Sequence, residues 1–384
     1  MPCPDSRRHP SASPRPRLGS VSSSPVAVRI LHPLPDAGAG PLARWVADGR
    51  ARLARRLRSG FEAAGADDVA IVEGSADGRA FGMRLRDLVG QPWAGGLVVL
   101  GSGAIPLATA ADLRAFVLSA GSDECRALAN NRYSADVVAI ARSARLPAIP
   151  DLPGDNALPR WLEEVAGYRV DDLRRRWRLA VDIDGPLDLV LTGTRQVIGD
   201  ATSFGIDLAP LTDRLGAVRR VAGEIRAELL IAGRTSAATV GWLERRTPSR
   251  TRALIEERGM RAASRLAQSS TTAGVPPQRP PGSVLGALLD LDGPDSLGHH
   301  LARLAEGAIV DTRVLLAHRL GADATAWPAA EDRFASDLLL ADRIADPWLR
   351  ALTASAAAAP IPILLGGHTL VGPGVRLVLG GSWT

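Results

Sequence analysis

The sequence predicts an α/β protein: a three-layer fold with a parallel-rich sheet and helices on both faces, followed by a second α/β region. Short apolar runs alternate along the chain with longer segments that are apolar at helical spacing. This alternation is typical of strand–helix–strand units, in which each helix returns the chain to the next parallel strand. With 384 residues and 46% hydrophobic content, the chain can bury a sizeable core in two or three domains.

We expect residues 26–208 to form the first domain. Its predicted strands are 26–30, 69–72, 97–100, 137–140 and 179–183, and its predicted helices are 42–61, 79–89, 110–119 and 157–166. The helix at 42–61 combines an apolar stripe with six arginines. We interpret those arginines as a solvated face, which is their commonest role on a helix.

The rest of the chain divides by composition. Residues 1–25 are rich in Pro, Ser and Arg and are expected to be disordered. Residues 209–267 are expected to form an α/β segment, residues 268–283 a linker, and residues 284–384 a C-terminal α/β region. The strands expected there are 228–232 and 361–365, and the helices are 211–226, 309–318 and 334–340.

Composition excludes several classes of function. None of the 46 basic residues is lysine, so the chain has no Walker-type lysine, no Schiff base and no lysine general base. Its two cysteines, Cys3 and Cys125, have no disulfide or zinc-ligand spacing, which favours a reducing cytoplasm. Without a membrane-length apolar run, and with a net charge of only +5, we expect a cytoplasmic protein that binds neither membrane nor nucleic acid.

The chemistry of the chain is concentrated in residues 179–189. A short apolar run there delivers Asp182 and Asp184 to its end and then turns at Gly185-Pro186. Two carboxylates at this point could hold a divalent metal. Alternatively, Pro186 begins a helix that Asp184 caps, although such a cap gives Asp182 and Asp188 no role.

Two segments carry a resemblance to a known family. "DIDGPLDL" at 182–189 resembles the D-x-D/N-T-P-x-D-L ending of GT-A-type nucleotidyltransferases that act on molybdenum cofactor, sugar phosphates and related acceptors. "LVVLGSGAIPLATAADL" at 97–113 is similar to their central V-V-G-x-D-x-P-L-L-T-x-x-D-L segment. The chain departs from the family at three points: Gly185 replaces the usual Thr, Ala104 stands at the position of a metal-binding aspartate, and the Gly-rich loop with Arg and Lys is absent after Ile30.

Over roughly residues 26–200, the resemblance implies metal-dependent transfer of a nucleotidyl group from an NTP to a phosphorylated small-molecule acceptor, with release of pyrophosphate. It implies Mg²⁺ or Mn²⁺ on Asp182 and Asp184, and it assigns no catalytic acid or base. Two alternatives stay open. One is a GT-A glycosyltransferase that uses a nucleotide-sugar, and the other is a non-catalytic nucleotide-binding or scaffold protein that kept the fold.

A polar loop precedes the predicted strand at 137–140. Asn130, Asn131, Arg132 and Asp136 give it many hydrogen-bond donors and acceptors, and we expect them to contact the substrate. The alternative is a local turn in which Asn and Asp side chains bond the neighbouring backbone.

Two further features belong to residues 209–384, where no family is recognised. Residues 233–236 follow a predicted strand and suit either an anion at a helix start or an ordinary capped turn. His368 has glycines nearby that permit the close approach of a ligand, and a hydrogen-bonded turn is the simpler interpretation.

Overall fold

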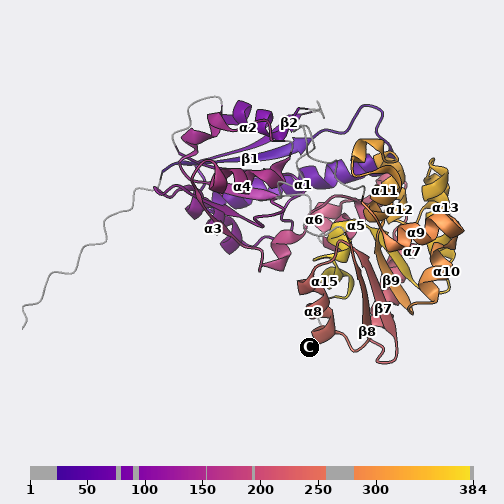
Figure 1. Cartoon of the computed structure of the whole chain (residues 1–384). Coiled ribbons are helices and arrows are strands. Elements are labelled where there is room, and N and C mark those ends of the chain that lie inside the picture. The colour runs from indigo at the N-terminus through magenta and orange to yellow at the C-terminus, as the bar shows by residue number, and fades with distance from the viewer. Residues whose placement is uncertain are drawn as a thin grey trace, which may run out of the picture.

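The computed structural model describes residues 24–74, 79–89, 95–152, 154–192, 195–256 and 281–380. Within them the chain forms two parallel-rich sheets flanked by helices, which lie side by side in Figure 1. The mixed α/β class and the second sheet are as the sequence predicts. Most of the expected tail at 1–25 and of the expected linker at 268–283 lies outside the described residues.

The first sheet has six strands in the order β2-β1-β3-β5-β4-β6. β2, β1 and β3 are parallel, β5 is antiparallel to both β3 and β4, and β6 is parallel to β4. The carboxyl ends of β1, β2, β3, β4 and β6 therefore share one edge with the start of β5. The strands are β1 (Val26–Pro33), β2 (Asp68–Gly74), β3 (Gly96–Gly101), β4 (Arg126–Ala129), β5 (Val137–Ile140) and β6 (Arg169–Asp172).

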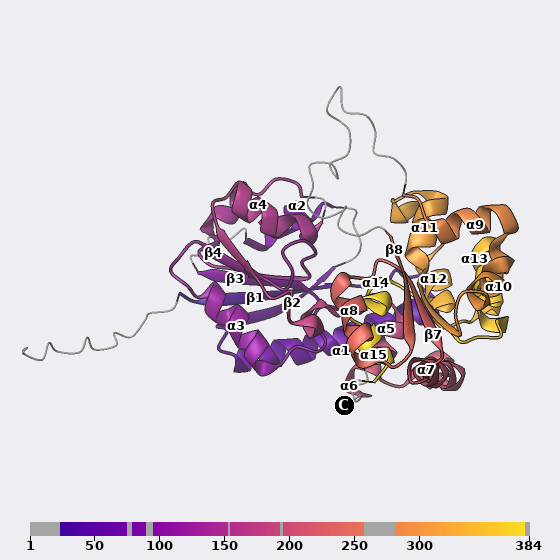
Figure 2. The same cartoon turned by 60° about the horizontal axis from the view of Figure 1, so that its bottom comes forward.

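Helices cover both faces of this sheet, because alternate residues of each strand point to opposite sides. Val28 and Ile30 belong to the core formed with α1 and α3, whereas Leu97 and Val99 belong to the core formed with α2 and α4. Figure 2 shows α2 and α4 over one face and α1 and α3 over the other. These helices are α1 (Pro41–Ala63), α2 (Phe81–Val89), α3 (Ala110–Ala120) and α4 (Leu158–Glu164).

The predicted strand at 179–183 is wrong. Its first residues end a 3₁₀ helix, Trp177–Ala180, and the segment then forms an isolated antiparallel bridge between Asp182 and Ala104 in place of a strand. β4 and β6, not predicted as strands, have four residues each. β6 lies at the sheet edge with the polar sequence Arg-Val-Asp-Asp, so it lacks the apolar run by which buried strands are recognised.

The second sheet has four parallel strands in the order β10-β9-β7-β8. It pairs a strand of the expected 209–267 segment with strands of the expected 284–384 region, so the two pieces form one unit. The first residues of the helix predicted at 309–318 belong to strand β9. A short, fully buried apolar run fits the helical and the strand periodicity equally well. The strands are β7 (Glu228–Gly233), β8 (Arg250–Ile255), β9 (Gly307–Asp311) and β10 (Ile363–Gly366).

The two units share a continuous hydrophobic core. α5 (Pro186–Thr192) and α6 (Arg195–Ile198) connect them, and α5 packs against both α1 and α12. No helix in the described ranges is long and apolar enough to cross a membrane. The helices of the second unit are α7 (Ala209–Ala222), α8 (Ala237–Arg246), α9 (Val284–Asp292), α10 (Leu297–Ala302), α11 (Thr312–Leu320), α12 (Ala330–Asp337), α13 (Pro347–Ala358), α14 (His368–Val371) and α15 (Val375–Val378).

Candidate functional site

A cavity of about 160 Å³ lies at the carboxyl ends of β1 and β3. Open α/β sheets bind ligands at this kind of edge, where strands end and loops diverge. Three carboxyl groups and one guanidinium, from segments far apart in the sequence, line this cavity, which we call the carboxylate cavity. Its lining includes Arg50, Asp136, Asp155 and Asp182, together with the ends of β1 and the turn at 101–104.

The turn after β3 holds Asp182 in the cavity wall. Ala104 pairs with Asp182 in the antiparallel bridge, and the Ile183 N–H donates to the Gly103 carbonyl oxygen at 3.0 Å. A Cβ atom on Gly103 would lie 2.7 Å from the Ile183 carbonyl oxygen and 2.9 Å from Asp182 Oδ1, so only glycine allows this close approach. Ile105 has a φ of 47°, a strained value for a β-branched residue. The turn at 101–104 therefore packs closely against residues 182–184, which we call the acidic segment.

Asp188 closes the start of helix α5. Its Oδ2 accepts hydrogen bonds from the backbone N–H groups of Asp184 at 3.0 Å and Gly185 at 2.9 Å. Asp188 would have no role if Asp184 capped the helix. In the structure Asp188 stabilises the turn at 184–185 through these two hydrogen bonds. The carboxylate of Asp184 faces Arg50 and His368 instead, with Oδ1 3.6 Å from an Arg50 Nη atom and Oδ2 3.5 Å from His368 Nδ1.

Asp182 and Asp184 have opposite electrostatic environments. Burial raises the pKa of Asp182 well above its ordinary value, and the negative charges of Asp184 and Asp136 add to that effect, with Arg50 acting against it. Burial also opposes ionisation of Asp184, but the charges of His368 and Arg50 outweigh it and lower its pKa. Asp184 is therefore the ionised partner, and Asp182 is the carboxyl group that a further positive charge would help to ionise.

Asp136 and Asp155 extend the acidic wall. Burial raises the pKa of Asp136 to about 7, against a hydrogen bond from Asn130 and with the charges of Asp155 and Asp184 adding to the rise. Burial raises the pKa of Asp155 as well, against hydrogen bonds from the local backbone. The cavity thus holds carboxyl groups that bind protons more readily than free aspartate does. A divalent cation would replace those protons.

The oxygen ligands of this site suit Mg²⁺ or Mn²⁺, both of which bind carboxylates. Across the described residues, no group of three or more His, Cys, Asp or Glu side chains is arranged to hold a metal. Mg²⁺ is commonly held by one or two carboxylates, with waters and substrate phosphates completing its coordination. Asp182 and Asp184 fit that partial set, and Ala104 beside Asp182 adds no ligand.

No family model matches this chain, and a comparison with curated proteins found no match. Two solved structures of Rv0371c from Mycobacterium tuberculosis H37Rv are 18% identical to it. The complex with manganese aligns with a TM-score of 0.25 over 40% of this chain and 88% of that chain. The other structure aligns with a TM-score of 0.26 over 47% of this chain and 100% of that chain.

The structure gives Asn130 a supporting position. Its buried side-chain amide donates to Asp136 Oδ2 at 2.8 Å and to the Leu179 carbonyl oxygen at 2.9 Å. Its Oδ1 accepts from the backbone N–H groups of Asp136 and Val137. Asn130 therefore joins the polar loop to the acidic segment and fixes Asp136 in the cavity wall.

Asn131 and Arg132 do not line the carboxylate cavity. Asn131 Oδ1 accepts from the Tyr133 N–H at 3.0 Å, a local turn of the kind considered as the alternative for this loop. Arg132 pairs with Glu163 and lies near the ring of Tyr133. Of the four polar residues predicted to contact substrate, the structure brings only Asp136 into the cavity.

Arg50 is a site residue that the sequence interpretation missed. Its Nε donates to the Ile183 carbonyl oxygen at 2.6 Å, and its guanidinium lines the carboxylate cavity. The interpretation of all six helix arginines as a solvated face is therefore wrong for this one. A signal was present, because Arg50 lies four residues after Val46 and three before Leu53, on the buried stripe of the helix.

The second unit also reaches the acidic segment. His368, at the start of α14, contacts Asp184, and Thr369 Oγ1 donates to the Asp182 carbonyl oxygen at 3.2 Å. No sequence pattern pairs these residues, because 187 positions separate Asp182 from Thr369. At 233–236 the structure has an ordinary capped turn, in which the Ser236 side chain accepts from the Thr239 N–H of helix α8.

Proposed function

We propose that this chain transfers a nucleotidyl group from an NTP to a phosphorylated small-molecule acceptor in the cytoplasm, with Mg²⁺ or Mn²⁺ as its metal. One observation carries the proposal: Asp182 lines the cavity at the carboxyl edge of the first sheet and pairs with Ala104, and Asp184 lies near Arg50, which lines the same cavity. The two sequence segments that resemble the nucleotidyltransferases are 97–113 and 182–189. Their contact in space supports the view that they form one site.

The surrounding residues have the chemistry that an NTP requires. Asp182 and Asp184 would hold the metal, and the bound ion would supply positive charge that offsets the negative charge of the phosphates. Arg50 would contact the phosphates beside them, since a guanidinium matches phosphate geometry. Asp136, with a pKa of about 7, can exchange a proton near neutral pH.

An apolar compartment adjoins the carboxylate cavity. It has a volume of about 200 Å³ and shares Asp136 and Asp155 with that cavity. Phe81, Val99 and Leu158 supply apolar walls. A planar ring of the donor nucleotide would be stabilised there, with its phosphates directed to the carboxylates and Arg50.

Two departures from the family predict weak binding. Ala104 removes one carboxylate from the metal site, and a chain without lysine lacks the family's usual contact with the triphosphate. We therefore expect loose NTP binding and slow turnover. Pyrophosphate release from an NTP separates this proposal from a GT-A glycosyltransferase, which would act on a nucleotide-sugar.

Calorimetry with each of the four NTPs, with and without Mg²⁺, tests the proposal. Wild type should bind at least one NTP more tightly with Mg²⁺, because the ion relieves repulsion between Asp182 and Asp184. Asp182→Asn should lose that metal-dependent gain. Asp171→Asn is the matched control, since Asp171 lies on edge strand β6, pairs with Arg126 and lines none of the cavities described above.

The outcomes separate the candidate functions. Binding curves that are identical for wild type and Asp182→Asn, with and without the ion, would reduce the acidic segment to a structural turn and favour a non-catalytic protein. Equal losses in Asp182→Asn and Asp171→Asn would also contradict the proposal, because they would reflect a general loss of carboxylate charge.

A further inference from the structure

A third cavity, larger than the two described above, lies where the two units meet, and we call it the interdomain cavity. It has a volume of about 550 Å³, within the usual range of small-molecule sites. Its walls come from residues 33–40, from the first turns of α1 and from the start of α12. It shares Pro33 and Arg50 with the carboxylate cavity, so a ligand that contacts Arg50 in it would lie at the border of the two cavities.

The walls of this interdomain cavity are mainly apolar. Leu34, Val46, Ala47 and Phe334 line it, and Leu34 is 43% exposed. Such walls favour the hydrocarbon or ring part of a ligand, because they remove apolar surface from water.

The charges in the cavity are unevenly placed. Arg50 is the cation of the lining, and it stands at the end shared with the carboxylate cavity. Glu331 is held by the N-terminus of α1, where its Oε1 and Oε2 accept from the backbone N–H groups of Leu42 and Ala43 at 3.0 Å each. Its negative charge is therefore already compensated. A ligand here meets one cation at one end and apolar walls along its length.

Arg50 has the capacity to bind an anion at that end. Its Nε donates to the Ile183 carbonyl oxygen, and an Nη atom lies 3.6 Å from Asp184 Oδ1. A guanidinium offers five N–H donors, so these two contacts leave others for a ligand. The triphosphate of an NTP fits this cavity poorly, because it carries several negative charges, whereas the described lining offers it the single cation Arg50 and adds the negative charge of Asp36.

We propose that the interdomain cavity is the acceptor site, and that the acceptor is a small phosphomonoester with an apolar body. The body lies against Leu34, Val46, Ala47 and Phe334, and the phosphate lies on Arg50 beside the metal-binding carboxylates. This assignment of the acceptor rests on the proposed function. The cavity, its apolar walls and its single cationic end are features of the structure and do not depend on that function.

Binding of three probes tests the proposal: n-hexyl phosphate, 1-hexanol and inorganic phosphate, each titrated into the full chain. n-Hexyl phosphate should bind at least about tenfold more tightly than either other probe, since it gains both apolar burial and the guanidinium contact. Ala47→Trp fills the cavity and should weaken n-hexyl phosphate by at least about tenfold. Leu34→Ser removes an exposed part of the apolar wall without touching the core, and it should weaken the same probe.

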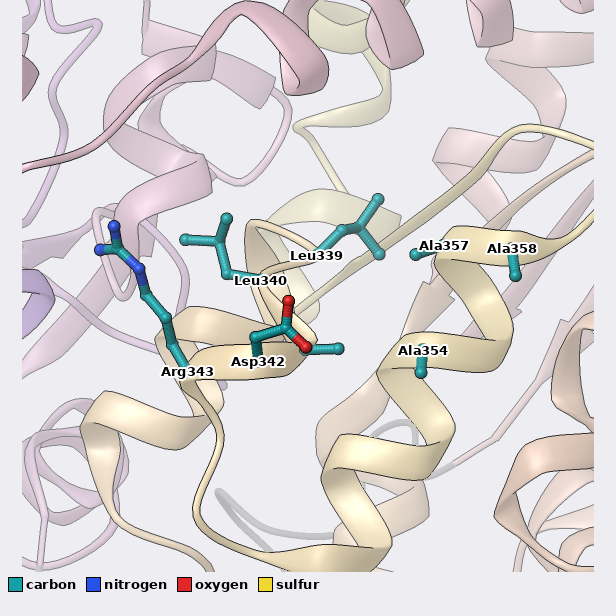
Figure 3. A pocket seen from close by; sticks show the side chains of 8 residues that line it. Leu339, Leu340, Asp342, Arg343, Ala354, Ala357 and Ala358 are labelled. Atoms are coloured by element: carbon teal, nitrogen blue, oxygen red, sulfur yellow. The ribbon is translucent and has the colours of Figure 1, made fainter.

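A separate cavity, similar in size to the interdomain cavity, supplies the matched control. It has a volume of about 530 Å³ and is lined by Leu339, Leu340 and helix residues including Ala354 and Ala357 (Figure 3). Ala357→Trp introduces the same side chain on a helix and should leave n-hexyl phosphate binding unchanged. The melting temperature of each variant reports whether it folds.

The proposal is overturned if n-hexyl phosphate binds no more tightly than inorganic phosphate, or if Ala47→Trp and Leu34→Ser both bind it as wild type does. Binding of Mg²⁺ and NTP, measured on the same samples, should be unaffected by Ala47→Trp. If the probe binds as expected but no NTP binds with Mg²⁺, the proposed function fails and the acceptor role fails with it. If NTP binds but the probe does not, only the acceptor site is wrong.

Discussion

Replacing Asp188 by asparagine should stabilise the protein near neutral pH. Asp188 is 5% exposed, and burial raises its pKa to about 8, with the charges of Asp184 and Asp337 adding to that effect and two backbone hydrogen bonds opposing it. The folded protein therefore keeps a proton on Asp188 at a pH where the unfolded chain has lost it. Asparagine is neutral at every pH and retains an oxygen that can accept from Asp184 and Gly185.

The size of this effect follows from the two pKa values of Asp188. Its ordinary pKa is 3.8 and its pKa in the folded protein is about 8, so between those values the folded state binds more protons than the unfolded state. The free energy of unfolding then falls as pH rises, by about 1.4 kcal/mol per pH unit for one group. From about pH 5 to about pH 7, the advantage of Asp188→Asn over wild type should grow by roughly 3 kcal/mol.

Urea unfolding followed by circular dichroism, at both pH values, measures this difference through the midpoints and slopes. Asp188→Ala is the matched control: it also removes the carboxyl group, but it leaves the buried Gly185 N–H and the partly buried Asp184 N–H without this acceptor, at about 1–3 kcal/mol for a fully buried group. It should be less stable than Asp188→Asn at both pH values. An advantage of Asp188→Asn that is the same at both pH values would refute the reasoning, because the buried carboxyl group would then not be protonated in the folded state.

Three further predictions concern stability. Against its burial, hydrogen bonds that the Asp112 carboxylate accepts from Thr109, Arg176 and Arg178 lower its pKa to about 2, so it contributes roughly 2 kcal/mol above pH 4 that is lost as pH falls towards 2; an acid titration of Asp112→Asn should lack this loss. Glu331→Ala removes the acceptor at the start of α1 and should cost about 1–2 kcal/mol in urea unfolding, whereas an unchanged midpoint would show that water replaces it. Arg313→Met leaves the buried carboxylate of Asp337 unpaired and should cost about 3–5 kcal/mol, with most of the loss recovered in the double variant with Asp337→Asn.

Local sequence pattern predicted the strands that are buried on both faces. β3 and β5 contain continuous apolar runs, and β1 is apolar apart from Arg29, His32 and its last residue, Pro33; the limits of all three agree with prediction to within about three residues. Edge strand β6 was missed because one of its sides has no neighbouring strand, and polar residues are tolerated there. β9 was merged with the helix that follows, since a buried strand and a buried helix have the same apolar composition.

The sequence by itself determined the fold class, the two acidic positions at 182 and 184, and the exclusion of lysine chemistry, because these depend only on residue type and short-range periodicity. Tertiary structure alone decided which groups share the site. Arg50, Asp136 and His368 reach the acidic segment from helix α1, a loop and helix α14 of the second unit. The pKa shifts of Asp136, Asp182 and Asp184 depend on that proximity and on burial. Charge interactions act through space, so no local pattern in the sequence can encode them.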